Sequence, residues 1–489
     1  MKRALVACVL AVALVASGCG AGAQTGSGDA AKLAPAGTLA YASFELAPQG
    51  PEKQGFDAAF GKLLGPDPET AIAKALVDAV KEQGSKLDYQ QDVKPWLGDT
   101  ASVAVTGVGA DHARPDFALL LASTNDDKAR AAIDTDLAGK NAESRNYRGV
   151  DYRVMSDGTA NGVVSGFLVA GTEPAFKAVV DTSKDGNSLA DSQAWHDSVG
   201  SRGDGKIGLA YVDLKAVIQS VLARVGGAER VLAPLALGLV QLHPFVATLS
   251  AGADSFVLDV SSPGTPADKR GPGAASSPLI ETLPGDSWFA LALPKVGPLL
   301  EKLVGALKLN PLIAAQYTRL NGQLRQHSGL DLERDLLAGI SDVGAFARGT
   351  SLRSLDAGVV VVARDRAALR RTVAGAQRLV RGGHLANQIH VQAGGPGAVA
   401  VYGSTRSALA PATRLGSSGL YRRAASELGA RPTLFVSIAP LLQLAGTSPK
   451  HRHALTPEDR ARLGHLDYLA VGAVRDGGLD VVRAVLGIH

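Results

Sequence analysis

The two halves of this chain carry the same succession of apolar and polar patterns, and this repetition limits the folds open to it. A Pro- and Gly-rich segment at 263–277, without hydrophobic periodicity, separates the halves. Each half opens with an apolar strand, Leu39–Phe44 or Trp288–Leu293, followed by helical stretches, paired strands, a charged helix, more strands and a hairpin. The period of roughly 220–250 residues exceeds that of solenoid repeats. We therefore predict an internal duplication with two similar domains, at 35–262 and 278–489.

The spacing of the strands indicates the fold class. They occur as neighbouring pairs joined by short turns, such as Ala101–Val108 with Asp116–Ala122, and a later apolar run, Gly162–Ala170, reads as one strand. This favours an α+β fold, in which each domain is an antiparallel sheet with helices packed on it. An apolar segment at Val231–Leu242 is short and contains Pro234, so we predict a buried helix there rather than a membrane span.

The N-terminus has the pattern of an export signal. Lys2 and Arg3 precede an uncharged run, Ala4–Ala16, that is too short to span a membrane. Ala16-Ser17-Gly18-Cys19 resembles the bacterial lipobox, which implies that a diacylglycerol is attached to Cys19 and that residues 1–18 are removed. The alternative is an ordinary signal peptide that happens to contain a cysteine.

The cysteine count supports the lipid anchor. The chain has two cysteines, which excludes a disulfide scaffold, and cleavage would remove Cys8 and leave Cys19 alone. One leftover thiol is unusual in an exported protein unless it carries lipid. Residues 19–34 are rich in Gly, Ala and Ser, and we predict a flexible tether. The expected location is the outer face of the cell membrane, held by two acyl chains.

Charge is distributed unequally between the halves. Residues 19–262 carry 21 Lys and Arg against 30 Asp and Glu, and residues 263–489 carry 27 against 16, so the net charges are −9 and +11. A helix following Asp365 is predicted to present a basic face, made of Arg366, Arg370, Arg371, Arg378 and Arg381. Three interpretations remain: a solvated helix face, attraction between the acidic and basic halves or between molecules, and contact with anionic lipid or wall polymer. Export and an aromatic content of 5% argue against nucleic acid as a partner.

The other motifs in the sequence do not predict a catalytic, phosphate-binding or metal-binding site. Gly200–Lys206 has the spacing of a phosphate-binding loop, but Ile207 replaces the required Ser or Thr, so a surface turn is the better interpretation. Two carboxylate pairs recur at helical spacing, and a structural role is favoured for both; they are Asp88 with Asp92, and Asp331 with Asp335. His451 and His453 lie in a turn-like segment rather than a metal site. We predict no catalytic residues, no metal site and no cofactor.

Three segments resemble one protein family. They are the proline-led first strand Pro35-Ala-Gly-Thr-Leu-Ala-Tyr41, the segment Asp92-Val-Lys-Pro-Trp-Leu-Gly98, and the strand Phe117–Ala122 before an acidic helix start. Together they are similar to the DUF3352 family of bacterial exported proteins and lipoproteins, typical of high-GC Gram-positive bacteria. The resemblance implies no catalytic residues, because the family has no assigned function. The second half lacks counterparts of Pro95 and Trp96, so it is the more diverged.

We therefore predict a lipid-anchored cell-surface protein with a non-enzymatic binding or scaffolding role, whose partner is an unidentified protein, wall polymer or lipid. Two alternatives remain at this point. One is a carrier or chaperone for a lipid or other apolar ligand, and the other is an exported enzyme with an unrecognised site.

Overall fold

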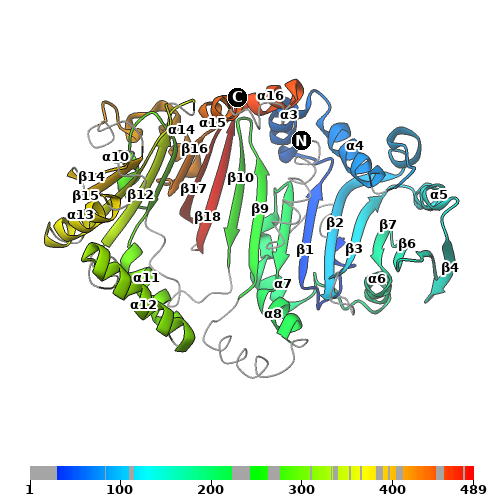
Figure 1. Ribbon diagram of the computed structural model, residues 1–489. Coiled ribbons are helices and arrows are strands. Elements are labelled where there is room, and N and C mark those ends of the chain that lie inside the picture. Colours follow the sequence, from blue (N-terminus) through cyan, green and yellow to red (C-terminus); the bar gives the residue numbers. More distant parts are fainter. Residues whose placement is uncertain are drawn as a thin grey trace. The chain divides into compact units, whose positions relative to one another are not determined.

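The computed structural model of the chain contains two compact units (Figure 1). Unit 1 comprises residues 1–271 with 476–481, and unit 2 comprises 272–475 with 482–489. The structure describes residues 30–82, 84–108, 115–222, 243–262, 276–308, 311–331, 333, 340–351, 354–363, 366–381, 389–394, 397–402, 411–447, 456–476 and 479–489. Helices and antiparallel sheets make up the described residues of both units, which confirms the predicted α+β class.

Unit 1 contains one antiparallel sheet. Its strands are β1 (Ala40–Glu45), β2 (Leu97–Val108), β3 (Pro115–Ser123), β4 (Ala142–Tyr147), β5 (Val150–Met155), β6 (Thr159–Val164), β7 (Phe167–Thr172), β8 (Gly208–Val212), β9 (Phe245–Ala251) and β10 (Ser255–Ser261). They pair in the order β10-β9-β8-β1-β2-β3-β7-β6-β5-β4. The first strand lies in the middle of the sheet, where Tyr41 of β1 pairs with Ala104 of β2 on one side and with Tyr211 of β8 on the other.

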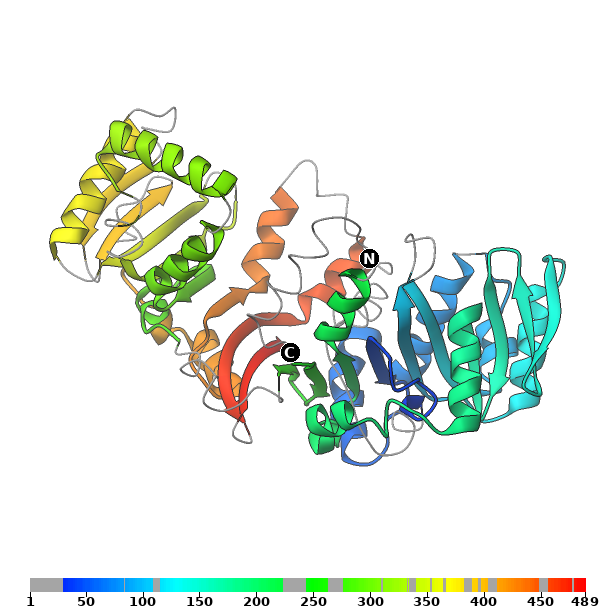
Figure 2. The ribbon, with the colours of Figure 1, turned by 90° about the horizontal axis from the view of Figure 1, so that it is seen from below.

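Helices cover both faces of this sheet. They are α3 (Pro51–Leu64), α4 (Pro68–Lys81), the π-helical turn η1 (Tyr89–Val93), α5 (Asp126–Leu137), α6 (Glu173–Asp185), α7 (Gln193–Ser198) and α8 (Leu214–Leu222). Alternate residues of β7 show the two faces: Phe167 belongs to the core formed with α6, and Leu168 belongs to the core formed with α4, η1 and α5. In Figure 2, α6 lies on the near side of these strands.

The chain enters the core of unit 1 at its first described residues. Ala30, Ala31 and Ala34 are fully buried, and Leu33 is 6% exposed. The amide of Leu189 donates to the carbonyl of Ala34 at 2.7 Å. The predicted flexible tether, 19–34, is therefore wrong for residues 30–34, because their small side chains pack into the core rather than providing flexibility. Residues 19–29 lie outside the described part of the chain.

A tight turn also corrects the predicted strand at Gly162–Ala170. Ser165 and Gly166 have φ angles of 47° and 80°, and the chain reverses there from β6 into β7. Two successive residues with positive φ form the turn that matches the twist of an antiparallel hairpin. The run is apolar throughout because one of its faces meets α6 and the other meets α5.

Unit 2 also contains an antiparallel sheet. Its strands are β11 (Ser287–Leu293), β12 (Ile340–Arg348), β13 (Asp356–Ala363), β14 (Ile389–Gly394), β15 (Gly397–Tyr402), β16 (Leu434–Ser437), β17 (Leu466–Asp476) and β18 (Leu479–Ile488). The described pairings give the order β14-β15-β13-β12-β11-β16-β17. Ala290 of β11 pairs with Phe346 of β12 and with Phe435 of β16, and all three side chains are buried.

The helices of unit 2 are α10 (Leu279–Thr282), α11 (Val296–Leu307), α12 (Pro311–Ser328), α13 (Arg366–Arg381), α14 (Gly419–Leu428), α15 (Ile438–Thr447) and α16 (Pro457–Gly464), with the short helical turn η5 (Leu415–Ser417). Helix α13 packs on β13, β14 and β15, and α12 packs beside α13 (Figure 2). Within the part of the chain that the structure describes, no helix is both long and apolar enough to cross a membrane.

Two predicted segments fall largely outside the described residues. The predicted buried helix Val231–Leu242 is one. The predicted linker 263–277 is the other, and only its last two residues are described. Of these, Ser277 is 1% exposed and its hydroxyl donates to the carboxylate of Asp342, so this end of the segment belongs to the packed part of unit 2.

Candidate functional site

The two predicted sites have different outcomes. Cys19 lies outside the described residues, so lipid attachment stays a prediction. The five arginines of the predicted basic face all belong to α13, and the side chains of Arg370, Arg371, Arg378 and Arg381 are exposed. The surroundings of the Arg366 side chain are outside the described residues.

Helix α13 is held to its unit by contacts on both sides of its exposed arginines. Val373 is buried, and a Cβ on Gly375 would lie 2.2 Å from the side chain of Leu330, so the helix backbone lies directly on that leucine. The side-chain amide of Gln377 donates to the carbonyl of Val391 in β14 at 2.9 Å. The four exposed arginines lie between these contacts around the helix.

One arginine of the basic face also holds the neighbouring helix. Arg378 donates from Nη1 to the carbonyl of Ser328, the last residue of α12. A cation is favourable at this end of a helix, where backbone carbonyls lack partners. Arg325 of α12 binds the carboxylate of Asp331, which is 7% exposed and also accepts from the amide of Glu333 at 2.9 Å. The first member of the pair Asp331 and Asp335 therefore has a structural partner, and Asp335 lies outside the described residues.

The other carboxylate pair caps the turn η1. Asp88 accepts from the amides of Gln90 and Gln91 at 2.9 and 3.1 Å, and Asp92 accepts from the amide of Asp88 at 2.7 Å. Such reciprocal bonds satisfy amides that a helical turn leaves without partners. The indole of Trp96 donates to the carbonyl of Asp92 at 2.6 Å, so the pair positions a buried tryptophan.

The phosphate-loop-like segment is a connection between α7 and β8. Gly200–Gly203 forms a short helical turn, and Arg202 donates to the carbonyls of Ser198 and Val199 at 2.8 and 3.2 Å. Burial lowers the pKa of Arg202. A strand follows the segment, whereas a phosphate-binding loop leads into a helix. The arrangement supports the surface-turn interpretation.

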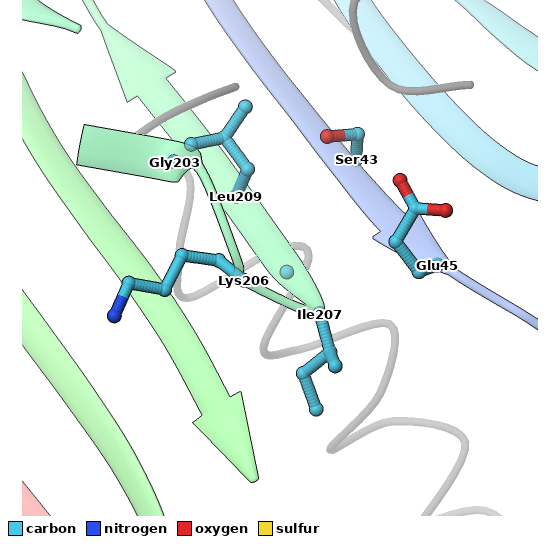
Figure 3. Close-up of a pocket in the computed structure, with 7 residues that line it drawn as sticks. Ser43, Glu45, Gly203, Lys206, Ile207 and Leu209 are labelled. Carbon is cyan, nitrogen blue, oxygen red and sulfur yellow. The ribbon is translucent and has the colours of Figure 1, made fainter. Parts of the chain in front are cut away.

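A small hollow lies beside this turn, at the ends of β1 and β8 (Figure 3). The space that a water molecule can occupy there is about 10 Å³, and Ser43, Glu45, Gly203, Lys206, Ile207, Gly208 and Leu209 line it. Lys206 donates to the hydroxyl of Ser250 at 3.0 Å, and Glu45 accepts from Thr100 at 3.3 Å. A space of this size holds about one water molecule, so the hollow is too small for an organic ligand.

An ionic cluster at the start of α6 is not among the sites predicted from the sequence. Glu173 accepts from Arg145 at 2.9 Å, from Tyr152 at 2.8 Å and from Lys177 at 3.0 Å. Burial opposes its ionisation, but the hydrogen bonds from Lys177, Tyr152 and Arg145 outweigh burial and lower its pKa to about 2. The cluster holds a carboxylate that stays ionised down to about pH 2 and joins α6 to β4 and β5.

Sequence spacing reveals only a part of this cluster. Glu173 and Lys177 stand four residues apart on one helix, which is a detectable pattern. Arg145 and Tyr152 reach the carboxylate only because the hairpin of β4 and β5 lies beside α6. Among the described residues, no group of three or more His, Cys, Asp or Glu side chains is placed to hold a metal ion.

Comparison with known proteins gives a family but no activity. No curated protein matches the chain. Among solved structures, one entitled "Structure of crystal form I of TP0453" is 10% identical, covering 48% of this chain and 79% of that chain with a TM-score of 0.27, so it identifies neither fold nor function. The family model described as "Protein of unknown function (DUF3352)" matches residues 3–377, which confirms the resemblance found in the sequence. The chain therefore belongs to the DUF3352 family of proteins of unknown function.

Proposed function

We propose that this protein is exported, is attached to the outer face of the cell membrane by a lipid on Cys19, and has a non-enzymatic binding or scaffolding role there. The observation that carries the proposal is the Ala16-Ser17-Gly18-Cys19 sequence behind a short apolar run. If Cys19 carries the lipid, the burial of Ala30, Ala31 and Ala34 leaves ten residues between the lipid and the core of unit 1.

The polar groups described above favour binding over catalysis. Asp88 and Asp92 accept hydrogen bonds from backbone amides, and Asp331 binds Arg325 of α12. Glu173 accepts hydrogen bonds from Lys177, Tyr152 and Arg145. With a pKa of about 2, Glu173 is a poor proton carrier at neutral pH, because catalytic acids and bases need a pKa near the working pH. The hollow beside β8 is too small for an acyl chain and gives no support to the carrier alternative.

Lipid attachment is tested in the bacterial host with Cys19→Ala and, as matched control, Cys8→Ala. We expect the wild type and Cys8→Ala to incorporate a radiolabelled or clickable palmitate and to fractionate with membranes. Cys19→Ala should carry no label. Globomycin, which blocks the lipoprotein signal peptidase, should cause the wild-type precursor to accumulate. Labelled Cys19→Ala protein would disprove the anchor.

We also propose that the two units arose by duplication. Seven strands of unit 1 pair in the order β9-β8-β1-β2-β3-β7-β6, and seven of unit 2 pair in the order β17-β16-β11-β12-β13-β15-β14. The first strand of each unit takes the same place: β1 lies between β2 and β8, and β11 lies between β12 and β16. The same order over seven strands in both units supports a common origin.

A local detail supports the same proposal. Before its first strand, each unit has a proline in an isolated antiparallel bridge, Pro35 with Ser188 and Pro284 with Arg414. The hydrogen bonds around the bridges also correspond. The amide of Leu189 donates to Ala34 at 2.7 Å, and the amide of Leu415 donates to Leu283 at 2.8 Å, with Ala36 to Asn187 and Gly285 to Thr413 completing each bridge.

A further inference from the structure

We propose that the α12–α13 surface, meaning the solvent-facing sides of these two neighbouring helices, binds the phosphate headgroups of an anionic phospholipid membrane. The inference deepens the proposed function, on which it rests, by naming the partner of the basic face. The two helices contain no Asp or Glu. Their arginines are Arg319, Arg325, Arg366, Arg370, Arg371, Arg378 and Arg381, of which Arg325 is paired with Asp331.

The first argument is the use of charge elsewhere in the molecule. Exposed arginines of unit 1 are held by carboxylates: Arg145 by Glu173, Arg148 by Asp181 and Arg153 by Asp134, at 2.8–2.9 Å. Among the described residues, no ion pair joins Arg370 or Arg381 to a carboxylate. Positive charge concentrated in this way is costly unless an outside anion approaches it.

The second argument is the helix in the same place in unit 1. Helix α5 connects β3 to β4, as α13 connects β13 to β14, and its first turn contains Asp126 and Asp127. Carboxylates of α5 are neutralised within the unit, Asp134 by Arg153 and Asp136 by Lys140. The fold therefore does not require a basic helix in this position, and the charge of α13 is a property of its own sequence.

The third argument concerns the shape of the partner. Helices of 18 and 16 residues are about 27 and 24 Å long. On these neighbouring helices Arg319, Arg370, Arg371 and Arg381 are exposed, and a membrane offers phosphates over a broad plane. Val373 of α13 is buried and Gln377 donates to the carbonyl of Val391 in β14, so the helix would rest on headgroups and not insert into acyl chains.

The fourth argument is proximity. A protein anchored through Cys19 meets the headgroups of its own membrane at high effective concentration, so weak single contacts add up. Each basic residue near an anionic surface contributes about a fivefold gain in affinity, and salt screens the attraction. A soluble polyanion gains no such advantage.

The test separates headgroup binding from the anchor. The full mature chain with Cys19→Ser is mixed with vesicles of phosphatidylcholine containing 30% phosphatidylglycerol, or of phosphatidylcholine alone, and cosedimentation is measured. We expect binding to the anionic vesicles only, and weaker binding at higher NaCl concentration. The double variant Arg370→Gln/Arg381→Gln should bind roughly 30-fold more weakly.

The matched control is Arg414→Gln/Arg422→Gln, which removes the same charge from exposed positions of unit 2 outside the α12–α13 surface. It should bind as the parent does, and circular dichroism should show that both variants fold. The proposal is overturned if anionic vesicles are not bound, or if both double variants lose affinity equally. It is also overturned if soluble polyphosphate binds in an Arg370- and Arg381-dependent way while vesicles do not. None of these results depends on lipid attachment to Cys19, which the Cys19→Ala fractionation tests by itself.

Discussion

Gly55 shows how closely helix α3 lies on the sheet of unit 1. A Cβ at this position would stand 2.0 Å from the carbonyl oxygen of Ala251 in β9, a distance that no side chain tolerates. We expect Gly55→Ala to displace α3 and to lower the free energy of unfolding by about 1–3 kcal/mol. Denaturant unfolding followed by tryptophan fluorescence measures the effect.

The control lies on the same helix. A Cβ on Gly61 would meet no atom within 4 Å, so Gly61→Ala should stabilise α3 by up to about 1 kcal/mol through helix propensity alone. Equal effects of the two substitutions would show that the close contact between α3 and β9 is absent in solution.

Glu173 makes a prediction about acid stability. Its pKa in the folded protein is about 2, below the value of about 4.3 of an unfolded glutamate. The resulting stabilisation is therefore present above about pH 4.5 and is lost as the pH falls towards 2. Glu173→Gln should be less stable than the wild type at pH 7, and its unfolding midpoint should change less between pH 4.5 and 2.5.

Glu143→Gln is the matched control, because Glu143 binds the same arginine, Arg145, from a more exposed position. It should keep nearly the whole acid dependence of the wild type. If Glu143→Gln and Glu173→Gln flatten the pH profile to the same extent, the low pKa is wrongly assigned.

At the scale of elements, two short turns close the hairpins at the β4 end of the sheet in unit 1. Arg148-Gly149 joins β4 to β5 and Ser165-Gly166 joins β6 to β7, and all four residues have positive φ. Gly166→Ala isolates the backbone cost, because a Cβ there would meet nothing within 4 Å. We expect a loss of about 1 kcal/mol.

Ser165→Asn should act in the opposite direction, because asparagine accepts positive φ more readily than serine. Thermal unfolding of the two variants beside the wild type is the measurement. A destabilised Ser165→Asn protein would contradict the turn geometry.

The same turns show what the sequence could and could not predict. The periodic helices α5 and α12 and the strands β1 and β11 were predictable, because each has its own apolar pattern. Strand β4 was not predictable, because its residues Ala142–Tyr147 are mostly exposed and have no apolar alternation. The basic face was predictable because it lies on one helix, whereas the Glu173 cluster depends on a hairpin brought to α6 by folding.

At the scale of the whole molecule, the proposed duplication makes a prediction about packing. Tyr41, Ala104 and Tyr211 are neighbours in unit 1, and the corresponding neighbours in unit 2 are Ala290, Phe346 and Phe435. In unit 1 the first strand carries the large residue, Tyr41, and the second strand the small one, Ala104. In unit 2 the first strand carries the small residue, Ala290, and the second strand the large one, Phe346. This is the pattern of a core that keeps its volume while its residues change.

We expect Tyr41→Ala to destabilise unit 1 by about 3–5 kcal/mol, because it leaves a cavity beside Trp195, whose ring centroid lies 5.5 Å from that of Tyr41. Adding Ala104→Phe should recover part of the loss, although Ala104→Phe alone should be destabilising. A double-mutant cycle in denaturant measures the coupling. Strictly additive losses would contradict the proposed equivalence of the two cores.

The buried start of unit 1 also limits how far its first residues can lie from the membrane. If Cys19 carries the lipid, eleven peptide units join it to Ala30, and even a fully stretched chain of that length spans only about 40 Å. Ala30 would then lie within about 40 Å of the bilayer surface. A partner that binds unit 1 near this residue must itself approach the membrane to about that distance, which makes other membrane-associated molecules its natural neighbours.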